Sequence, residues 1–176
     1  MDWRVPGPLS KSADLRLAGS DEAMEQPRFD PRNPGYAARV RDSFAMQGAM
    51  ATIGASLADI TPGRVVIELD WAAGLCQQHG FLHAGMVATA LDSACGYAGF
   101  TLMPADAGVL TIEFKINLLA PAKGQRFRMV GKVIKPGRTV TVTEGRAYAI
   151  DDGHEKLIAT MGATLMTITG REDVKN

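Results

Sequence analysis

A single carboxylate lies inside a long apolar stretch of this chain. Residues 81–103 are nearly all apolar or small, and the one carboxylate among them is Asp92, nine residues after His83. A segment this apolar is expected to form a helix that is buried on most of its faces. Burial would raise the pKa of Asp92, which suits a group that activates water or attacks a substrate near neutral pH. We therefore take Asp92 as a candidate catalytic residue.

Other reactive side chains close to Asp92 have no context that gives them a role of their own. His79 and His83 are four residues apart, which would suit a metal pair on a helix, but Gly80 lies between them and a third ligand is missing. Ser93 is not in the G-x-S-x-G context of a hydrolase nucleophile. The chain carries neither a dinucleotide fingerprint nor a Walker sequence. We expect no metal and no cofactor.

The composition is that of one ordinary domain, and its charge balance does not indicate a strongly charged partner. The chain has 176 residues, with 19 Lys+Arg and 19 Asp+Glu, so its net charge is zero. This balance argues against nucleic acid or an acidic membrane as a partner. Cys76 and Cys95 lie in apolar contexts without metal-type spacing, and the first residues lack the apolar region of a secretory signal. We therefore expect a cytoplasmic protein with reduced thiols.

The chain divides into three parts by composition. Residues 1–35 contain several prolines and little periodicity, which predicts a loosely ordered extension. A single domain is expected over 36–170, with a short tail over 171–176. Within the domain, the helical spacing of Val40, Phe44 and Met50 predicts a first helix from residue 36 to about residue 50.

The rest of the domain is rich in strand patterns on both sides of the long apolar helix. Short apolar or alternating runs, separated by turn residues, predict strands over 55–60, 65–71, 109–119, 126–135, 139–150 and 156–168. Pro136-Gly137-Arg138 is a turn between two of these runs and predicts a hairpin. We expect an α+β fold in which the last four strands form a meander and the antiparallel sheet curls around the long central helix. The second face of that helix would be left for another subunit.

The segment from Gln77 to Ala94 resembles the signature of hotdog-fold acyl-CoA thioesterases of the phenylacetate-pathway (PaaI-like) type, within the 4-hydroxybenzoyl-CoA thioesterase superfamily. In that family a G-x-x-H-G-G stretch opens the central helix, and a catalytic Asp follows nine residues after the His. Gly80, His83, Gly85 and Asp92 match this pattern. The resemblance covers roughly residues 40–168.

Two further segments carry the resemblance, and two positions depart from it. Residues 118–122 are similar to the end of a family strand, and residues 136–139 are similar to the family's hairpin. Ala84 stands in place of the first Gly of H-G-G, and Gln77 stands where many members have Asn. The second departure leaves room for a different way of holding water.

The resemblance implies a thioester hydrolase and assigns a role to each residue of the motif. Asp92 would be the general base or the nucleophile, and the backbone amide of Gly85 would polarise the thioester carbonyl. His83 would cap the helix or donate a hydrogen bond to the thioester carbonyl or sulfur. Gln77 would hold the lytic water or the carbonyl, and Thr111 would orient the water.

The resemblance also indicates partners and an assembly. Lys132, Lys135 and Arg138 would hold the CoA phosphates, and the substrate would be the CoA thioester of a small aromatic or a short- or medium-chain acid. Gly85 and Asp92 are about 10 Å apart along one helix, at 1.5 Å per residue, which is too far to act on one carbonyl carbon. The hypothesis is a homodimer with sites shared between subunits, two of which pair into a tetramer.

Two other functions are compared for the same fold. A dehydratase or hydratase would show an acid–His pair with a characteristic spacing that this chain lacks. A non-catalytic acyl-CoA-binding or regulatory module stays open, although the presence of both Asp92 and Gly85 speaks against it. The acyl group is expected to lie near five large side chains: Phe44, Met50, Phe81, Tyr97 and Phe114.

Overall fold

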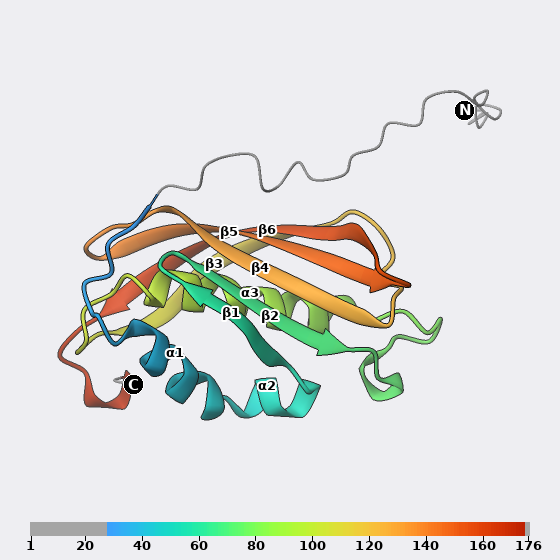
Figure 1. The fold of residues 1–176 in the computed structure, drawn as a ribbon, viewed down its shortest axis with the longest axis horizontal. Helices are drawn as coiled ribbons and strands as arrows, with labels where there is room; N and C mark the ends of the chain where they lie inside the picture. The colour runs from blue at the N-terminus through green and yellow to red at the C-terminus, as the bar shows by residue number, and fades with distance from the viewer. Residues whose placement is uncertain (1–27, 175–176) are drawn as a thin grey trace, which may run out of the picture.

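The structure, a computed structural model, describes residues 28–174 and contains one long helix, α3 (Ala84–Phe100), packed on a six-stranded antiparallel sheet (Figure 1). Two short helices, α1 (Tyr36–Ala45) and α2 (Gly48–Ile53), come first. The strands are β1 (Ser56–Thr61), β2 (Arg64–Asp70), β3 (Gly108–Leu118), β4 (Arg126–Lys135), β5 (Val140–Asp151) and β6 (His154–Ile168), and 3-10 turns are formed by η1 (Ala73–Leu75) and η2 (Glu172–Val174). No helix in the described residues is long and apolar enough to cross a membrane. The predicted α+β arrangement of a long helix and a curled antiparallel sheet is confirmed.

The pairing of β3 differs from the predicted meander. The strand order is β1-β2-β4-β5-β6-β3, so β4, β5 and β6 are consecutive hairpins but β3 lies at the edge beside β6. Burial explains this choice. Phe127 and Met129 of β4 are completely buried against α3, whereas residues 112–115 of β3 are all exposed. The strand that buries its side chains against α3 therefore takes the central position next to β2, and adjacency in sequence does not decide the pairing.

The first predicted helix is two helices. The break falls at Gln47, whose backbone is extended (φ −81°, ψ 94°) and which precedes the first residue of α2. Gly48 follows it, and glycine weakens a helix interior. Met50 on α2 is almost fully buried, so the second helix is set by its own contact with the core.

The predicted domain boundaries are only partly covered by the structure. Residues 1–27 and 175–176 lie outside the described residues, so most of the predicted extension over 1–35 and the end of the predicted tail are not described. Within the described part, residues 28–35 precede α1 without forming a helix or strand, and Phe29 packs against the core.

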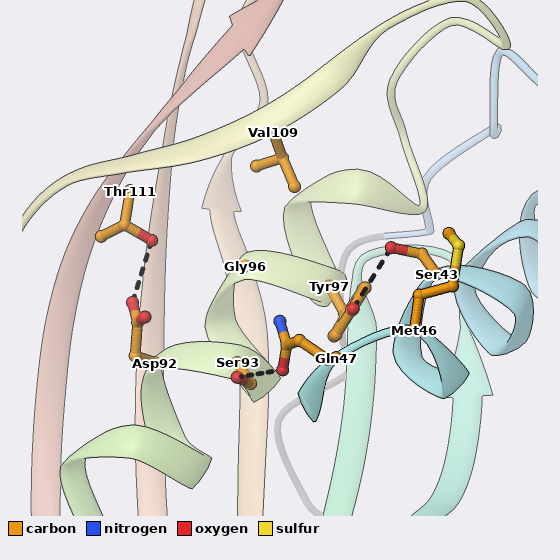
Figure 2. Close-up of a pocket in the computed structure, with 9 residues that line it drawn as sticks. All are labelled: Ser43, Met46, Gln47, Asp92, Ser93, Gly96, Tyr97, Val109 and Thr111. Carbon is orange, nitrogen blue, oxygen red and sulfur yellow. Dashed lines mark hydrogen bonds between the residues drawn. The ribbon is translucent and has the colours of Figure 1, made fainter. Parts of the chain in front are cut away.

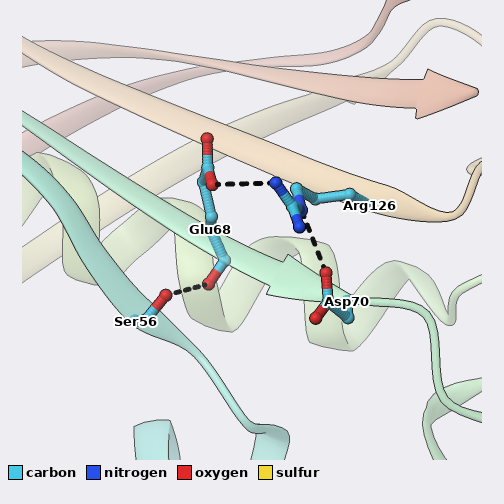
Figure 3. A network of polar contacts seen from close by, with 4 residues as sticks. All are labelled: Ser56, Glu68, Asp70 and Arg126. Atoms are coloured by element: carbon cyan, nitrogen blue, oxygen red, sulfur yellow. Dashed lines mark hydrogen bonds and ion pairs between the residues drawn. The ribbon is translucent and has the colours of Figure 1, made fainter. Parts of the chain in front are cut away.

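A small polar network joins the ends of β1, β2 and β4 (Figure 3). Arg126 donates a 3.0 Å hydrogen bond to Asp70, its register partner, and lies 3.9 Å from Glu68, whose backbone carbonyl accepts from Ser56 at 3.5 Å. The Arg126 side chain is 55% exposed. Exposed ion pairs of this kind contribute at most about 1 kcal/mol. The register of β2 against β4 is therefore fixed mainly by the buried side chains between them.

Two glycines let α3 approach the sheet closely. Gly131 on β4 and Gly145 on β5 face each other in register. A Cβ atom on Gly131 would lie 2.2 Å from the carbonyl oxygen of Ala94, and one on Gly145 would lie 2.8 Å from the Cys95 sulfur. The buried side of the helix has small side chains: Ala90, Ala94 and Ala98 are completely buried. This close contact sets the height of α3 above the sheet.

We expect Gly131→Ala to destabilise the protein by about 1–3 kcal/mol, because its methyl group would meet the backbone of α3 rather than a flexible side chain. Thermal unfolding would measure the loss. Gly162→Ala is the matched control, because a Cβ atom added to Gly162, on strand β6 of the same sheet, would meet no atom within 4 Å. Equal melting temperatures for the two variants would contradict this account of the helix–sheet contact.

Candidate active site

The carboxylate of Asp92 is held by a hydroxyl on the edge strand. Asp92 lies halfway along α3, and its Oδ1 accepts a 2.9 Å hydrogen bond from Thr111 Oγ1 on β3 (Figure 2). Burial raises the pKa of Asp92, and the hydrogen bond from Thr111 partly opposes that rise in pKa. The predicted pair is thus brought together, and the carboxylate keeps its second oxygen available for a water molecule.

Asp92 and Thr111 open into a pocket of about 250 Å³. Its walls come from α1 and the α1–α2 break (Ser43, Met46, Gln47), from α3 (Asp92, Ser93, Gly96, Tyr97) and from β3 (Val109, Thr111). Ser93 Oγ donates to Gln47 Oε1 at 3.1 Å, and the hydroxyls of Ser43 and Tyr97 lie 3.2 Å apart. The pocket therefore has polar groups at both ends and along its floor.

His83 caps the start of α3. Its Nδ1 accepts a 2.9 Å hydrogen bond from the Gly85 amide, and its carbonyl accepts from the amides of Met86 and Val87. Because Nδ1 is an acceptor here, the proton of the neutral ring sits on Nε2. The His83 side chain is exposed, so this N–H faces outward. Capping, one of the two roles predicted for His83, is present in the structure.

The first amide of α3 is the free one. Gly85, whose amide is predicted to polarise the carbonyl, donates that amide to His83, and this role for Gly85 stays a prediction. The amide of Ala84 has no acceptor among residues 28–174. The first amides of a helix lack intrahelical partners and lie at the positive end of the helix dipole. Ala84 is thus a candidate site residue that sequence reasoning missed, and the signal for it was its place directly after the capping residue.

A second hollow of about 530 Å³ lies beside the start of α3. It is lined by Gln77, Phe81, Leu82, Ala84, Val87, Leu118, Leu119, Ala120, Pro121, Ala122 and Ile158. The Gln77 side-chain oxygen accepts a hydrogen bond from the His79 amide, which ties it to its own loop. Gln77 and Ala84 therefore share one groove, and most of that groove is apolar.

The structure separates the predicted site residues into two groups. Asp92 and Thr111 form one group, and Gln77, His83 and the first amides of α3 form the other. Ala84 and Asp92 are eight residues apart, or about 12 Å along the helix axis. A single chain therefore does not bring the carboxylate and the free amide to one carbonyl carbon.

The predicted phosphate-binding cations lie elsewhere. Lys132, Lys135 and Arg138 belong to β4 and to the hairpin after it, and they line neither of the two hollows. The adjacent Pro136 and Gly137 line a different cavity, near the end of α3. Their role in CoA binding stays a prediction.

The five side chains expected near the acyl group are also dispersed. Tyr97 lines the Asp92 pocket, and Phe44 packs against it with ring centroids 5.9 Å apart. Phe81 lines the groove at the start of α3, whereas Met50 is 1% exposed and belongs to the core. Phe114 is exposed on β3. In the described residues no group of three or more His, Cys, Asp or Glu could hold a metal ion.

Comparison with known proteins places this geometry in a family. Residues 79–156 match the model of the thioesterase superfamily. The crystal structure of a thioesterase family protein from Silicibacter pomeroyi is 58% identical, with a TM-score of 0.76 over 77% of this chain and all of that one. The Escherichia coli PaaI protein of the phenylacetic acid degradation operon shares the fold at 15% identity, with a TM-score of 0.67 over 77% of this chain and 94% of that one.

Curated relatives also have names of ester or thioester hydrolases. A Saccharolobus solfataricus protein named as an esterase is 36% identical over 86 residues, which is 49% of this chain and 61% of that protein, or less than two thirds of its length. A 1,4-dihydroxy-2-naphthoyl-CoA hydrolase of Listeria monocytogenes is 25% identical over 67% of this chain and 94% of that one. The fold and these matches define the chain as a hotdog-fold thioesterase. The chain belongs to the thioesterase superfamily, as its motif predicts, and the non-catalytic alternative is not favoured.

We expect Thr111→Val to move the acidic limb of the kcat/KM profile to higher pH. In its predicted role as a base or nucleophile Asp92 acts in the ionised form, and loss of the Thr111 donor favours the protonated form, so the pKa of Asp92 rises further. Thioester hydrolysis measured between pH 4 and pH 9, about the range in which carboxylates and histidines titrate, would show the shift. Thr111→Ser keeps the hydroxyl and should keep the wild-type limb. An unchanged limb in Thr111→Val would contradict the role of this hydrogen bond.

Proposed function

We propose that the protein hydrolyses acyl-CoA with Asp92 as the base that activates water. The carboxylate would take a proton from water while the water oxygen bonds to the thioester carbon. The oxyanion then re-forms the C=O double bond and the C–S bond breaks. The proton goes to the sulfur, so that the products are the free thiol of CoA and a carboxylic acid. The observation that carries this proposal is the Asp92–Thr111 pair, half-buried in a pocket and with a pKa raised by burial.

The start of α3 supplies the groups that stabilise the oxyanion. The Ala84 amide is without an acceptor in the described residues, and the outward Nε2–H of His83 is its immediate neighbour in sequence. Donors aimed at the developing negative charge commonly lower a barrier by about 3–4 kcal/mol each. The Gly85 amide acts on this pair indirectly, because its bond to Nδ1 keeps the His83 proton on Nε2.

The separation of the two groups leads us to propose a site shared by two copies of the chain. About 12 Å of helix separates Ala84 from Asp92, but a two-fold axis would bring the start of one α3 opposite the middle of the other. Each dimer then has two equal sites. Each site would combine Asp92 and Thr111 of one subunit with the groove and free amide of the other.

The edge strand β3 supports this assembly. It is 11 residues long, and among residues 28–174 it pairs with β6 alone and leaves its other edge open. Its large apolar side chains are unusually exposed: Ile112, Phe114 and Leu118 are 52%, 46% and 57% exposed. A long apolar edge invites a second strand. Pairing two copies of β3 would continue the sheet and cover these side chains.

A second apolar surface supports the proposed pairing of dimers. Leu110 of β3 and Val140 of β5 are both register partners of Met166 on β6, so these side chains form a row across the sheet. Leu110 and Val140 are 47% and 44% exposed, and Val142 next in line is 40% exposed. We propose that this row is the contact between dimers.

The substrate class and location follow from the same features. A pocket of about 250 Å³ suits a small aromatic or a short- or medium-chain acyl group, and one relative is named for a CoA thioester of an aromatic acid. Lys132, Lys135 and Arg138 are proposed to hold the CoA phosphates. Cys76 and Cys95 are free thiols, and burial raises the pKa of Cys95 to about 12, which supports a reducing, cytoplasmic location.

We expect Asp92→Asn to lower the release of free thiol from acyl-CoA by about 10²–10⁴-fold. The same variant should melt at a higher temperature at pH 7, because a carboxyl whose pKa is raised on folding destabilises the folded state once the pH exceeds its unfolded pKa. Asp42→Asn on the exposed face of α1 is the control. Full turnover in Asp92→Asn would overturn the proposed chemistry, and acyl-CoA binding without turnover in the wild type would indicate a non-catalytic module.

Ala84→Pro should remove the proposed oxyanion donor and little else. Proline is favoured at the first position of a helix, and the preceding His83 already has an extended backbone (φ −63°, ψ 138°) that proline accepts. We expect kcat to fall about 10²–10³-fold with the melting temperature kept. Ala84→Gly, which retains the amide, should stay active. A fully active Ala84→Pro would show that this amide does not contact the substrate.

Hybrid dimers of Asp92→Asn and Ala84→Pro test the shared site. If each site takes Asp92 from one subunit and Ala84 from the other, one site of the hybrid is intact and the hybrid should recover about half of the wild-type activity. Subunits with different tags would allow the hybrid to be purified. A hybrid as inactive as its parents would mean that each site lies within one subunit.

A further inference from the structure

The part of the Asp92 pocket around Gln47 and Ser93 is polar, and hydrolysis at Asp92 does not explain why. Catalysis requires Asp92, Thr111 and the oxyanion donors. The same pocket also contains Gln47 and Ser93, which are hydrogen-bonded to each other and half-buried. A pocket that takes only hydrocarbon would be lined by apolar side chains at this end.

Gln47 is directed into the pocket by the break between α1 and α2. Its extended backbone interrupts the helix, so its side chain extends towards α3 instead of following the surface of α1. Ser93 Oγ then donates to Gln47 Oε1 at 3.1 Å, which fixes the orientation of the amide. Figure 2 shows the amide nitrogen of Gln47 turned away from Ser93 and towards Gly96.

The amide nitrogen of Gln47 is a donor without an acceptor. Among residues 28–174 no hydrogen bond from Gln47 Nε2 is formed. Of the other polar groups of the pocket, Asp92 accepts from Thr111, and the hydroxyls of Ser43 and Tyr97 are paired at 3.2 Å, which leaves one of these two hydroxyls with a free O–H. When an acyl group displaces water from this pocket, the Gln47 amide is a donor that loses its partners unless the acyl group supplies an acceptor.

The helix leaves space for that acyl group. Gly96 lies one turn beyond Asp92 on the same face of α3, and a Cβ added to it would meet no atom within 4 Å. The path from the Asp92 carboxylate to the Gln47 amide therefore passes over a residue without a side chain. Met46 and Val109 form apolar walls around this path.

We propose that Gln47 is a specificity-determining residue, whose amide donates to an oxygen on the acyl group remote from the thioester. The substrates preferred would be acyl-CoAs with a distal hydroxyl, carbonyl or ether oxygen, over hydrocarbon acyl-CoAs of the same size. This inference rests on the proposed hydrolysis at Asp92. It adds a second point of recognition, at the opposite end of the acyl group.

The experiment compares substrates that differ by one oxygen. Free thiol release would be measured for 4-hydroxyphenylacetyl-CoA against phenylacetyl-CoA, and for 6-hydroxyhexanoyl-CoA against hexanoyl-CoA. The wild type should prefer the oxygen-bearing member of at least one pair by about tenfold in kcat/KM, the value of one net hydrogen bond to an otherwise unpaired group. Gln47→Met, which keeps the length of the side chain, should bring this ratio to about one by losing activity only on the oxygen-bearing substrate.

Two further variants make the test secure. Gln125→Met alters an exposed glutamine before β4, outside the pocket, and should keep the wild-type ratio. Gly96→Ala adds a methyl group on the acyl path without a clash, so it should fold and should lower kcat/KM for both members of each pair. Its effect does not depend on the folding of the Gln47 variant.

The outcomes separate this inference from the proposed function. Equal rates on both members of each pair in the wild type, or a preference that Gln47→Met leaves unchanged, would overturn the role of Gln47 while leaving hydrolysis intact. Wild-type rates in Gly96→Ala would show that the acyl group does not lie along this path, and this result would also overturn the role of Gln47. Failure of the wild type to hydrolyse any of the four thioesters would instead count against the proposed function.

Discussion

The close contact between α3 and two glycines of the sheet is the constraint on which the rest of the structure depends. Gly131 and Gly145 leave no room for side chains beneath Ala94 and Cys95, so the helix backbone lies almost directly on the strands. This contact fixes the height and direction of α3. The same helix carries Asp92 in its middle and the free Ala84 amide at its start. The glycine contact therefore also fixes where these two groups lie relative to the sheet.

The helix therefore has two opposite requirements. Its sheet-facing side is small and fully buried, which favours stability, while its other side holds a carboxylate whose pKa is raised by burial. Such a carboxylate opposes folding at neutral pH, and Thr111 offsets only part of that effect. A structure selected for stability alone would not keep an ionisable group at this position, and this is the physical reason that Asp92 is conspicuous in the sequence.

Local patterns predicted most elements and the centre of the site. The runs over 126–135 and 156–168 were visible as strands, and Asp92 stood out because its neighbours are apolar. The position of β3 beside β6 depended on which strand buries more apolar surface, a comparison that no single segment contains. The break at Gln47 depended on backbone geometry, so the pocket donor was not predicted. Capping by His83 was predicted, but not that the cap takes the Gly85 amide and leaves the Ala84 amide free.

The geometry of one helix is the reason for proposing a site shared by two copies of the chain. A helix N-terminus is a good place for an oxyanion, and the middle of a half-buried helix is a good place for a carboxylate with a raised pKa, but both cannot reach the same atom within one helix. A two-fold axis resolves the conflict without new residues. In the proposed dimer, Gln47 and Ser93 of each pocket stay within one subunit, so recognition of the acyl group would be local, whereas the chemistry would need both subunits.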